Sequence, residues 1–388
     1  MPIVALVLAV GFGFALLLLL RAHSADRAAA RARAMLQEAR DRSDERAAQL
    51  LAQCCAECEK ILASHPRHLL AWHVWGAALW CLGRWSPADK ADALFAEAEE
   101  KFSRALEIKP DETKLAIDLC WVLWERAGLH SGVMGLEYLE RICEESDRLL
   151  VRKPGEARLL NFWASALCCM GTRMSGPDAD SMLAAAEAKF KEVLAVTPND
   201  QNVMSSLGNV LWRRSRLRHG DEAREFLIRA WEWLEKALEV KPGDPRALST
   251  GAWVLYARTR LMPGEETNRM LADAAARFAV AESGGADVLL QGQGVLLWAQ
   301  SRCVGADQAA ELLQQAKTRL AEAESHDPES AAYNLACVCA QLGETDECRH
   351  WLEKSREPGI LVSREQMASE EELANVREYA WFRQLLGY

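Results

Sequence analysis

Small and bulky residues alternate along this chain at a helical spacing. Positions twelve, eight and five residues before a series of regularly placed breakers carry a small, a bulky and a small side chain: Ala98, Phe102 and Ala105; Ala186, Phe190 and Val193; Ala230, Leu234 and Ala237; Ala274, Phe278 and Ala281; Ala316, Leu320 and Ala323. Such positions share one face of an α-helix. The pattern therefore predicts amphipathic helices whose small residues admit a neighbouring helix, while the bulky residue fills the gap.

The breakers set a period of 44 residues. Most are prolines, in the pairs His65-Pro66, Lys109-Pro110, Lys153-Pro154, Thr197-Pro198 and Lys241-Pro242. The next falls at Ala286 after two glycines, and the last is Asp327-Pro328, two residues early. A period of this length indicates stacked helix pairs, and proline ends the second helix because it cannot continue one. The first helix of the first copy reads "LLAWHVWGAALWCLG".

These motifs resemble the tetratricopeptide repeat. The matching residues are the small–bulky–small–Pro sets and, in the first copy, Trp72, Gly76 and Gly83. The resemblance implies an all-α, right-handed solenoid of antiparallel helix pairs and a platform for protein partners. The family unit has about 34 residues, so each copy here has an insertion between its helices. We expect a longer second helix, begun by caps of the Ser86, Ser175 or Asp221 type. The third copy departs from the pattern, with Ile142, Ser146 and Leu149 in the three positions.

The predicted organisation follows the breakers. An anchor covers residues 1–21, and residues 22–66 form a membrane-proximal helix with a leading half-repeat, read as one long helix over 24–64. The final repeat is placed at 329–359 and a C-terminal capping segment at 360–388, since "YNLACVCAQLGETDECRHWLEKSREPG" resembles the end of such arrays. Six long repeats lie between them, at residues 67–110, 111–154, 155–198, 199–242, 243–286 and 287–328.

The N-terminal run is apolar. Residues 2–20, "PIVALVLAVGFGFALLLLL", contain no charge, and at about 1.5 Å per residue they nearly match a hydrocarbon core of about 30 Å. Basic residues come only after the run: Arg21, Arg27, Arg31, Arg33, Arg40, Arg42 and Arg46. The positive-inside rule then predicts a single-pass anchor with its N-terminus outside and the repeats in the cytoplasm, as in a bacterial inner membrane. Cleavage of the run as a secretory signal is the alternative.

Composition narrows the chemistry. A net charge of −10 argues against nucleic acid as a partner. The 12 cysteines are expected to be reduced. Cys54, Cys55 and Cys58, with His65 and His68 nearby, raise the possibility of zinc, but Cys54 and Cys58 fall on repeat packing positions, so we predict core thiols and no metal. No phosphate loop or nucleophile elbow occurs, and we predict no cofactor and no enzymatic activity.

Aromatic and arginine ladders are the candidate binding features. Trp80, Trp124, Trp212, Tyr256 and Trp298 recur in the first helices, where the family turns its concave surface. They either grip a partner or pack against the second helix of their own copy, which is the simpler interpretation. The candidate concave surface comprises Trp80, Trp121, Trp124, Asn161, Ser165, Asn209, Trp212, Arg213, Arg216, Trp253, Tyr256 and Trp298.

Arg126, Arg214, Arg258 and Arg302 recur at the same spacing. They either clamp an acidic peptide or complement helix C-termini, and the second interpretation is favoured for the regular ladder. The extra arginines near Arg214, which are Arg213, Arg216 and Arg218, are the better indication of a binding site.

Three functions remain open from the sequence. The first is a membrane-anchored scaffold that recruits a protein or peptide partner to the cytoplasmic face, either as a monomer or as a homo-oligomer. The second is a receptor or chaperone-like platform for incoming polypeptides. The third is a ligand-binding or enzymatic protein that uses a cavity in the solenoid.

Overall fold

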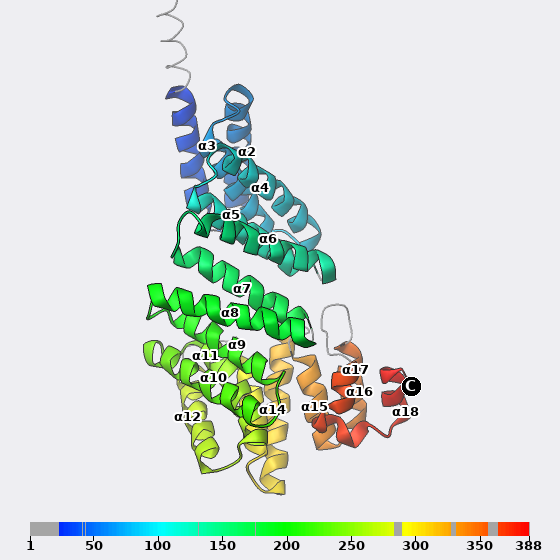
Figure 1. Ribbon diagram of the computed structural model, residues 1–388. Helices are drawn as coiled ribbons and strands as arrows, with labels where there is room; N and C mark the ends of the chain where they lie inside the picture. Colours follow the sequence, from blue (N-terminus) through cyan, green and yellow to red (C-terminus); the bar gives the residue numbers. More distant parts are fainter. Residues whose placement is uncertain are drawn as a thin grey trace, which may run out of the picture. The chain divides into compact units, whose positions relative to one another are not determined.

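The computed structural model describes residues 23–40, 42, 44–130, 132–174, 176–282, 289–326, 331–355 and 364–387, and this part is helical with connecting turns and no strand (Figure 1). The chain forms two compact units that divide between Phe162 and Trp163, inside helix α7. The predicted anchor, residues 1–21, lies outside the described residues. Within the described ranges, no helix has both the length and the apolar character needed to cross a bilayer.

Unit 1 is a series of packed helices. A helix over residues 23–40 is followed by α2 (Glu45–Ser64), α3 (Leu69–Arg84), α4 (Ala88–Ile108), α5 (Thr113–Leu129) and α6 (Gly132–Leu150), and then by the start of α7 (Ala157–Arg173). Each of the helices α2 to α5 packs against the next one along the chain, and α3 also contacts α5. The first helices of successive copies therefore lie side by side.

Unit 2 continues the same scheme. It holds α8 (Gly176–Val196), α9 (Gln201–Ser215), α10 (Gly220–Val240), α11 (Pro245–Leu261), α12 (Glu265–Glu282), α13 (Leu290–Ser301), α14 (Ala306–His326), α15 (Ala332–Leu342) and α16 (Thr345–Lys354). Three short elements close the chain: α17 (Arg364–Ser369), the 3-10 helix η2 (Glu371–Val376) and α18 (Ala380–Leu386). First helices again touch, α9 with α11 and α11 with α13, while η2 packs on α15.

The 44-residue spacing is visible in the helix starts. Five first helices begin at Leu69, Thr113, Ala157, Gln201 and Pro245, each 44 residues after the last. Most second helices are also longer than their partners; α9 has 15 residues and α10 has 21. The inserted residues between the two helices of a copy thus extend the second helix.

The predicted caps of the second helices are wrong where the structure describes them. Ser86 donates its hydroxyl to Leu82 O at 2.8 Å, and α4 begins after Pro87. Asp221 lies inside the first turn of α10, which begins at Gly220 with φ 58°. Glycine adopts this left-handed conformation without the steric cost of a Cβ, so backbone geometry starts this helix. Ser175 lies outside the described residues.

The small–bulky interlock is confirmed. Ala98, Phe102 and Ala105 are fully buried, as are the divergent Ile142, Ser146 and Leu149 of the third copy. In three copies the bulky residue, Phe102, Leu234 or Leu320, packs on a glycine of the first helix of its own copy. A Cβ added at Gly208 would lie 2.6 Å from Leu234 Cγ, and one at Gly294 would lie 2.6 Å from Leu320 Cγ. These helix pairs are therefore held closer than any larger side chain would allow.

The expectation of one long helix over residues 24–64 is wrong. The first helix ends at residue 40, and Asp44 caps α2 by accepting a hydrogen bond from Ala47 N at 2.9 Å. An N-cap aspartate begins a new helix because its carboxylate satisfies a backbone donor that has no other partner. Buried alanines at 25, 29, 32 and 39 then pack in one core with Leu51, Cys54 and Cys58 of α2. The chain thus folds back and forms a helix pair of its own.

Candidate functional site

First helices of neighbouring copies bring aromatic rings into contact in unit 1. Trp80 of α3 stacks on Trp121 of α5 with ring centroids 6.4 Å apart, and Trp121 meets Phe162 of α7 edge to face at 4.9 Å. We call Trp80, Trp121 and Phe162 the unit 1 row. Its members are 41 residues apart, one helical turn less than the repeat, because neighbouring first helices touch one turn out of register. Trp121 remains 41% exposed.

A second row lies in unit 2. Trp212 of α9 is 5.6 Å from Trp253 of α11, which meets Tyr256 edge to face at 6.1 Å, and Tyr256 lies 4.5 Å from Trp298 of α13. We call Trp212, Trp253, Tyr256 and Trp298 the unit 2 row. Trp298 also donates Nε1–H to Gln341 Oε1 of α15 at 2.7 Å. The rings therefore bridge first helices of successive copies, rather than resting only on the second helix of their own copy.

Arginines border the unit 2 row at both ends. The guanidinium carbons of Arg213 and Arg216 each lie 5.5 Å from the Trp212 ring centroid, and Arg213 donates Nε–H to Asn209 Oδ1 at 2.7 Å. Burial lowers the pKa of Arg213, and the charge of Arg216 adds to the effect. At the far end, Arg302 lies 5.9 Å from the Tyr256 ring. The row is thus an aromatic surface with positive charge around it.

Three successive glutamates of the same chain fill the centre of this surface. Glu370, Glu371 and Glu372, which we call the acidic segment, join α17 to η2. Tyr256 donates its hydroxyl to Glu372 Oε1, and Arg302 Nη1 donates to the same oxygen at 3.2 Å. Arg260 Nη1 lies 3.5 Å from Glu370 Oε1, and its Nη2 lies 3.3 Å from Glu371 Oε2. The side chain of Glu372 is fully buried.

The two buried carboxyl groups of the acidic segment titrate differently. Burial raises the pKa of Glu370 to about 7, and the neighbouring Glu372 carboxylate adds to this, while Arg260 and Arg216 oppose it. Burial also disfavours ionised Glu372, but hydrogen bonds from Glu370 and Tyr256 and the charge of Arg260 lower its pKa overall. Close carboxyl groups cannot easily both ionise. Glu372 is therefore the member that ionises first, and Glu370 keeps its proton to a higher pH.

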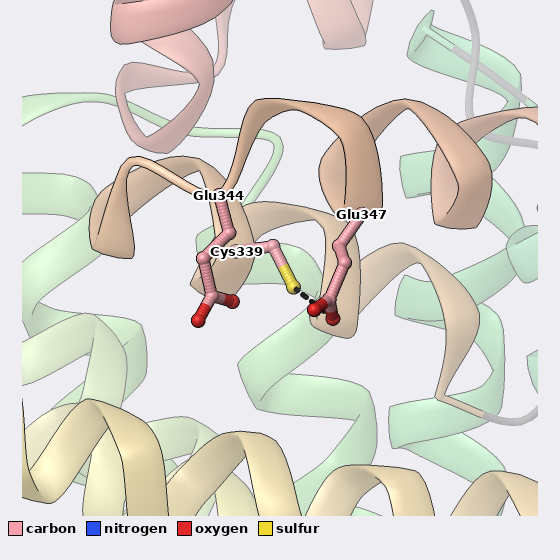
Figure 2. Close-up of side chains that lie close together, drawn as sticks. All are labelled: Cys339, Glu344 and Glu347. Carbon is pink, nitrogen blue, oxygen red and sulfur yellow. Dashed lines mark hydrogen bonds between the residues drawn. The ribbon is translucent and has the colours of Figure 1, made fainter.

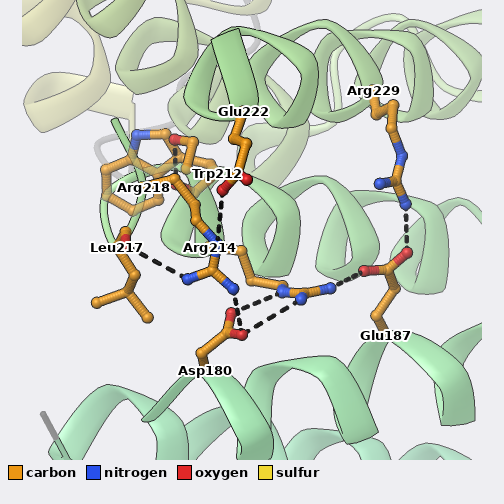
Figure 3. A network of polar contacts seen from close by, with 9 residues as sticks. Asp180, Glu187, Trp212, Arg214, Leu217, Arg218, Glu222 and Arg229 are labelled. Carbon is orange, nitrogen blue, oxygen red and sulfur yellow. Dashed lines mark hydrogen bonds and ion pairs between the residues drawn. The ribbon is translucent and has the colours of Figure 1, made fainter. Parts of the chain in front are cut away.

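Two members of the regular arginine ladder, Arg126 and Arg214, form internal ion clusters, while Arg258 contacts only Glu266, at 3.4 Å, among the ion pairs resolved for it. In Figure 3, Arg214 of α9 reaches Asp180 and Glu187 of α8, at 3.0 and 2.7 Å, and Arg218 and Arg229 complete the cluster. Burial opposes ionisation of Glu187, but bonds from Lys191 and Arg214 hold its pKa below the usual range.

The cluster recurs 88 residues earlier in unit 1. There Arg126 binds Asp92 at 2.9 Å and Glu99 at 2.6 Å, joined by His130 and Arg141. Each central arginine also covers a ring, Tyr138 at 4.5 Å and Phe226 at 4.6 Å. Arg126 and Arg214 each lie in the last turn of their helix, as the helix C-terminus interpretation expects, and both guanidiniums are bound to carboxylates of the preceding helix. They are therefore not available to clamp an acidic peptide.

The cysteines behave as core residues. Cys54 and Cys58 are fully buried, and Cys54 donates its thiol to Ala32 O at 3.2 Å. Burial raises the pKa of Cys55 to about 12. A metal-like grouping occurs elsewhere, at Cys339, Glu344 and Glu347 (Figure 2). Lys317 already binds Glu344 at 2.7 Å and Glu347 at 2.6 Å, and burial raises the pKa of Cys339 to about 12. A neutral thiol and lysine-bound carboxylates are poor metal ligands.

A surface groove of about 580 Å³ lies over α12, α13 and α14, lined by Phe278, Leu296, Gln300 and Glu322 among others. It is wide and open to solvent. Ligand pockets enclose most of their ligand, with a few convergent polar groups at the reacting end. The groove does not have that character.

The predicted surface residues are thus only partly brought together. Trp80 and Trp121 meet in unit 1. In unit 2 one continuous series of contacts, in which Trp212, Tyr256 and Trp298 are buried, joins Asn209, Trp212, Arg213, Arg216, Trp253, Tyr256 and Trp298. Trp124 is half-buried on α5 and stacks on no other aromatic ring of the described part, and Asn161 and Ser165 are half-buried on α7. The sequence analysis missed Phe162, Arg260 and the acidic segment. A search at 41-residue spacing would have found Phe162.

Comparison with known proteins finds one matching family model and several similar solved structures. The family model described as "Plant specific mitochondrial import receptor subunit TOM20" matches residues 134–250, less than half of the chain. No curated protein matches the chain. Similar solved structures include a tetratricopeptide repeat protein from Parabacteroides merdae, 15% identical, covering 77% of this chain and 93% of that one with a TM-score of 0.48.

Two further structures show the same kind of likeness. Yeast Tom70 is 15% identical, with 83% of this chain and 58% of that chain covered and a TM-score of 0.45. PilW, a type IV pilus biogenesis factor, is 19% identical, with 66% and 96% covered and a TM-score of 0.43. At these identities the likeness concerns the fold alone, and the all-helical, paired arrangement of this chain fits a tetratricopeptide repeat array.

Proposed function

We propose that this protein is a scaffold that docks a protein or peptide partner on the first helices of unit 2. The observation that supports it is the surface around the unit 2 row, where rings from three successive copies are bordered by Arg213, Arg216 and Arg302. Large aromatic rings and arginines dominate binding energy at protein interfaces because they bury much area at low entropic cost. Repeat arrays offer such extended surfaces rather than deep catalytic pockets.

Site-specific photo-cross-linking tests this proposal. A cross-linking amino acid at position 216, where Arg216 is exposed beside Trp212, should capture a partner in cells that make the protein. The matched control is position 232, where Glu232 is exposed on the second helix α10. We expect a discrete cross-linked species from position 216 alone. Equal capture from both positions would place binding elsewhere.

We propose further that residues 2–20 anchor the array to a membrane with the repeats in the cytoplasm. The support is the uncharged run and the arginines that follow it. Membrane-impermeant thiol labelling of intact cells tests the topology. A cysteine placed at the exposed Glu232 should stay unmodified until the cells are permeabilised, and labelling in intact cells would reverse the orientation.

A receptor for incoming polypeptides is a second candidate. The match of residues 134–250 to a mitochondrial import receptor family favours it. A receptor should bind many unrelated extended peptides with similar weak affinity, whereas a scaffold should select one partner. A peptide array probed with the full-length protein separates the two outcomes.

A further inference from the structure

The acidic segment occupies the docking surface as a bound peptide would. Three consecutive carboxylates meet three cationic or hydroxyl partners on two neighbouring first helices, Tyr256 and Arg260 from α11 and Arg302 from α13. The segment lies more than 60 residues from these helices in sequence, and it approaches them with its side chains. The only regular element in residues 370–376 is the six-residue 3-10 helix η2.

A structural cap would not need this chemistry. Leu373 and Val376 of η2 are buried, and Asn375 donates to Ala340 O of α15 at 3.4 Å, so apolar packing already attaches η2 to the array. Buried ion pairs add little net stability because desolvation offsets their attraction. Arg302 Nε is moreover buried with no hydrogen-bond partner. The carboxylates therefore contribute complementarity to the surface more than stability to the fold.

Part of the surface is left over. Arg213 lies over the Trp212 ring and donates a hydrogen bond to Asn209, with no carboxylate among the partners resolved for it. Arg216 is exposed on the same ring and close enough to Glu370 to lower its pKa. The positive surface thus extends past the acidic segment along the row. A ligand longer than three residues would find further cations there.

We infer that the acidic segment is an internal inhibitor of the docking surface, and that the partner is an acidic peptide segment that displaces its carboxylates. This rests on the proposed function and names its partner class. The internal copy competes at an effective concentration on the order of millimolar. A peptide with an intrinsic Kd of about 0.1 mM would then bind roughly 10-fold more weakly to the closed protein than to the open one.

The test uses the full-length protein and a labelled synthetic peptide, MASEEELANVRE, which copies residues 367–378. The double variant Glu371→Gln, Glu372→Gln weakens the contacts of the acidic segment and leaves the residues of the docking surface unchanged. The matched control is Glu378→Gln, because exposed Glu378 pairs only with Arg383 in the contacts resolved for it. Fluorescence anisotropy should show about 10-fold tighter binding to the double variant than to the wild type or the control.

Two further measurements keep the result interpretable. Adding Arg260→Gln and Arg302→Gln to the double variant should abolish binding, while circular dichroism and the thermal midpoint check that each variant is folded. Hydrogen exchange of residues 367–376 reports whether the segment is released. Equal peptide binding by wild type and double variant would overturn the inference and leave the docking function standing. A released segment without peptide binding would overturn both.

Discussion

The two aromatic rows arise from the same repeat, yet one is open and the other is filled. In the unit 1 row Trp121 is 41% exposed and Phe162 is 8% exposed, whereas Trp212, Tyr256 and Trp298 of the unit 2 row are 8%, 8% and 3% exposed. The ring-to-ring contacts between first helices are alike in both. In unit 2 the acidic segment reaches Tyr256 and Arg302, and Gln341 of α15 accepts a hydrogen bond from Trp298. Repeat geometry therefore provides an aromatic surface at each turn, and local contacts decide whether it is available.

The largest expected effect tests that difference directly. Tyr256→Ala should lower the free energy of unfolding of unit 2 by about 3–5 kcal/mol, since it empties a buried site and removes the donor to Glu372. Trp121→Ala should cost unit 1 less, about 1–3 kcal/mol, because Trp121 is 41% exposed and so loses less buried area. Urea denaturation followed by circular dichroism measures both. Similar costs would show that the two rows are equally buried in solution.

The ion clusters allow a second comparison. Arg214→Gln should destabilise by about 2–3 kcal/mol, because it leaves the nearly buried Glu187 with weaker compensation. Arg126→Gln should cost about 1–2 kcal/mol, since Glu99 and Asp92 are more exposed than their counterparts. The same denaturation experiment applies, with Arg104→Gln as an exposed control on α4. A larger cost for Arg126 would contradict the ranking by burial.

The filled row should respond to pH, whereas nothing in the unit 1 row predicts such a response. The pKa of Glu370 is raised to about 7 in the folded state, facing Arg216, Arg260 and Glu372 and, on α15, Tyr333 and Cys337. Because the pKa of Glu370 is higher in the docked state, the protonated carboxyl stabilises the docked segment. This contribution is complete below the pKa that the carboxyl has in the unfolded chain. That contribution declines as the pH rises from about 4.5 and is lost above about 7.

Each pKa unit corresponds to about 1.4 kcal/mol, so segment docking should weaken by up to about tenfold between pH 6 and pH 8. Amide exchange of residues 367–376, corrected for intrinsic rates, measures it. Glu370→Gln should remove the pH dependence, because glutamine mimics the protonated acid. If amide-exchange protection of the wild-type segment were constant across this range, the interpretation that protonated Glu370 stabilises docking would be wrong.

The smallest effect refines the comparison of the ion clusters. His130 stands in unit 1 where Arg218 stands in unit 2, each against an aspartate of the preceding helix. His130→Arg should stabilise unit 1 by at most about 0.5–1 kcal/mol at neutral pH, since Asp92 is partly solvated. The thermal midpoint should rise slightly in low salt and return in high salt. A clear destabilisation would show that the imidazole shape, rather than charge, is needed.

Local pattern was enough to determine the repeated architecture of this protein. The Ala98–Phe102–Ala105 triple and its copies specify one helical face, and the prolines end each pair, because both effects act within a few turns of chain. The break at Asp44 was also encoded locally, by an N-cap, but the continuous Ala- and Arg-rich composition around it obscured the signal.

Only the tertiary structure decided which side chains meet. The offset of one helical turn between first helices moved the aromatic contacts from 44 to 41 residues, and so joined Trp121 to Phe162. The return of Glu370–Glu372 onto Tyr256 and Arg302 depends on contacts across 70 residues or more. No periodicity encodes such a contact, because the segment lies outside the repeat and its placement follows from charge and burial in the assembled fold.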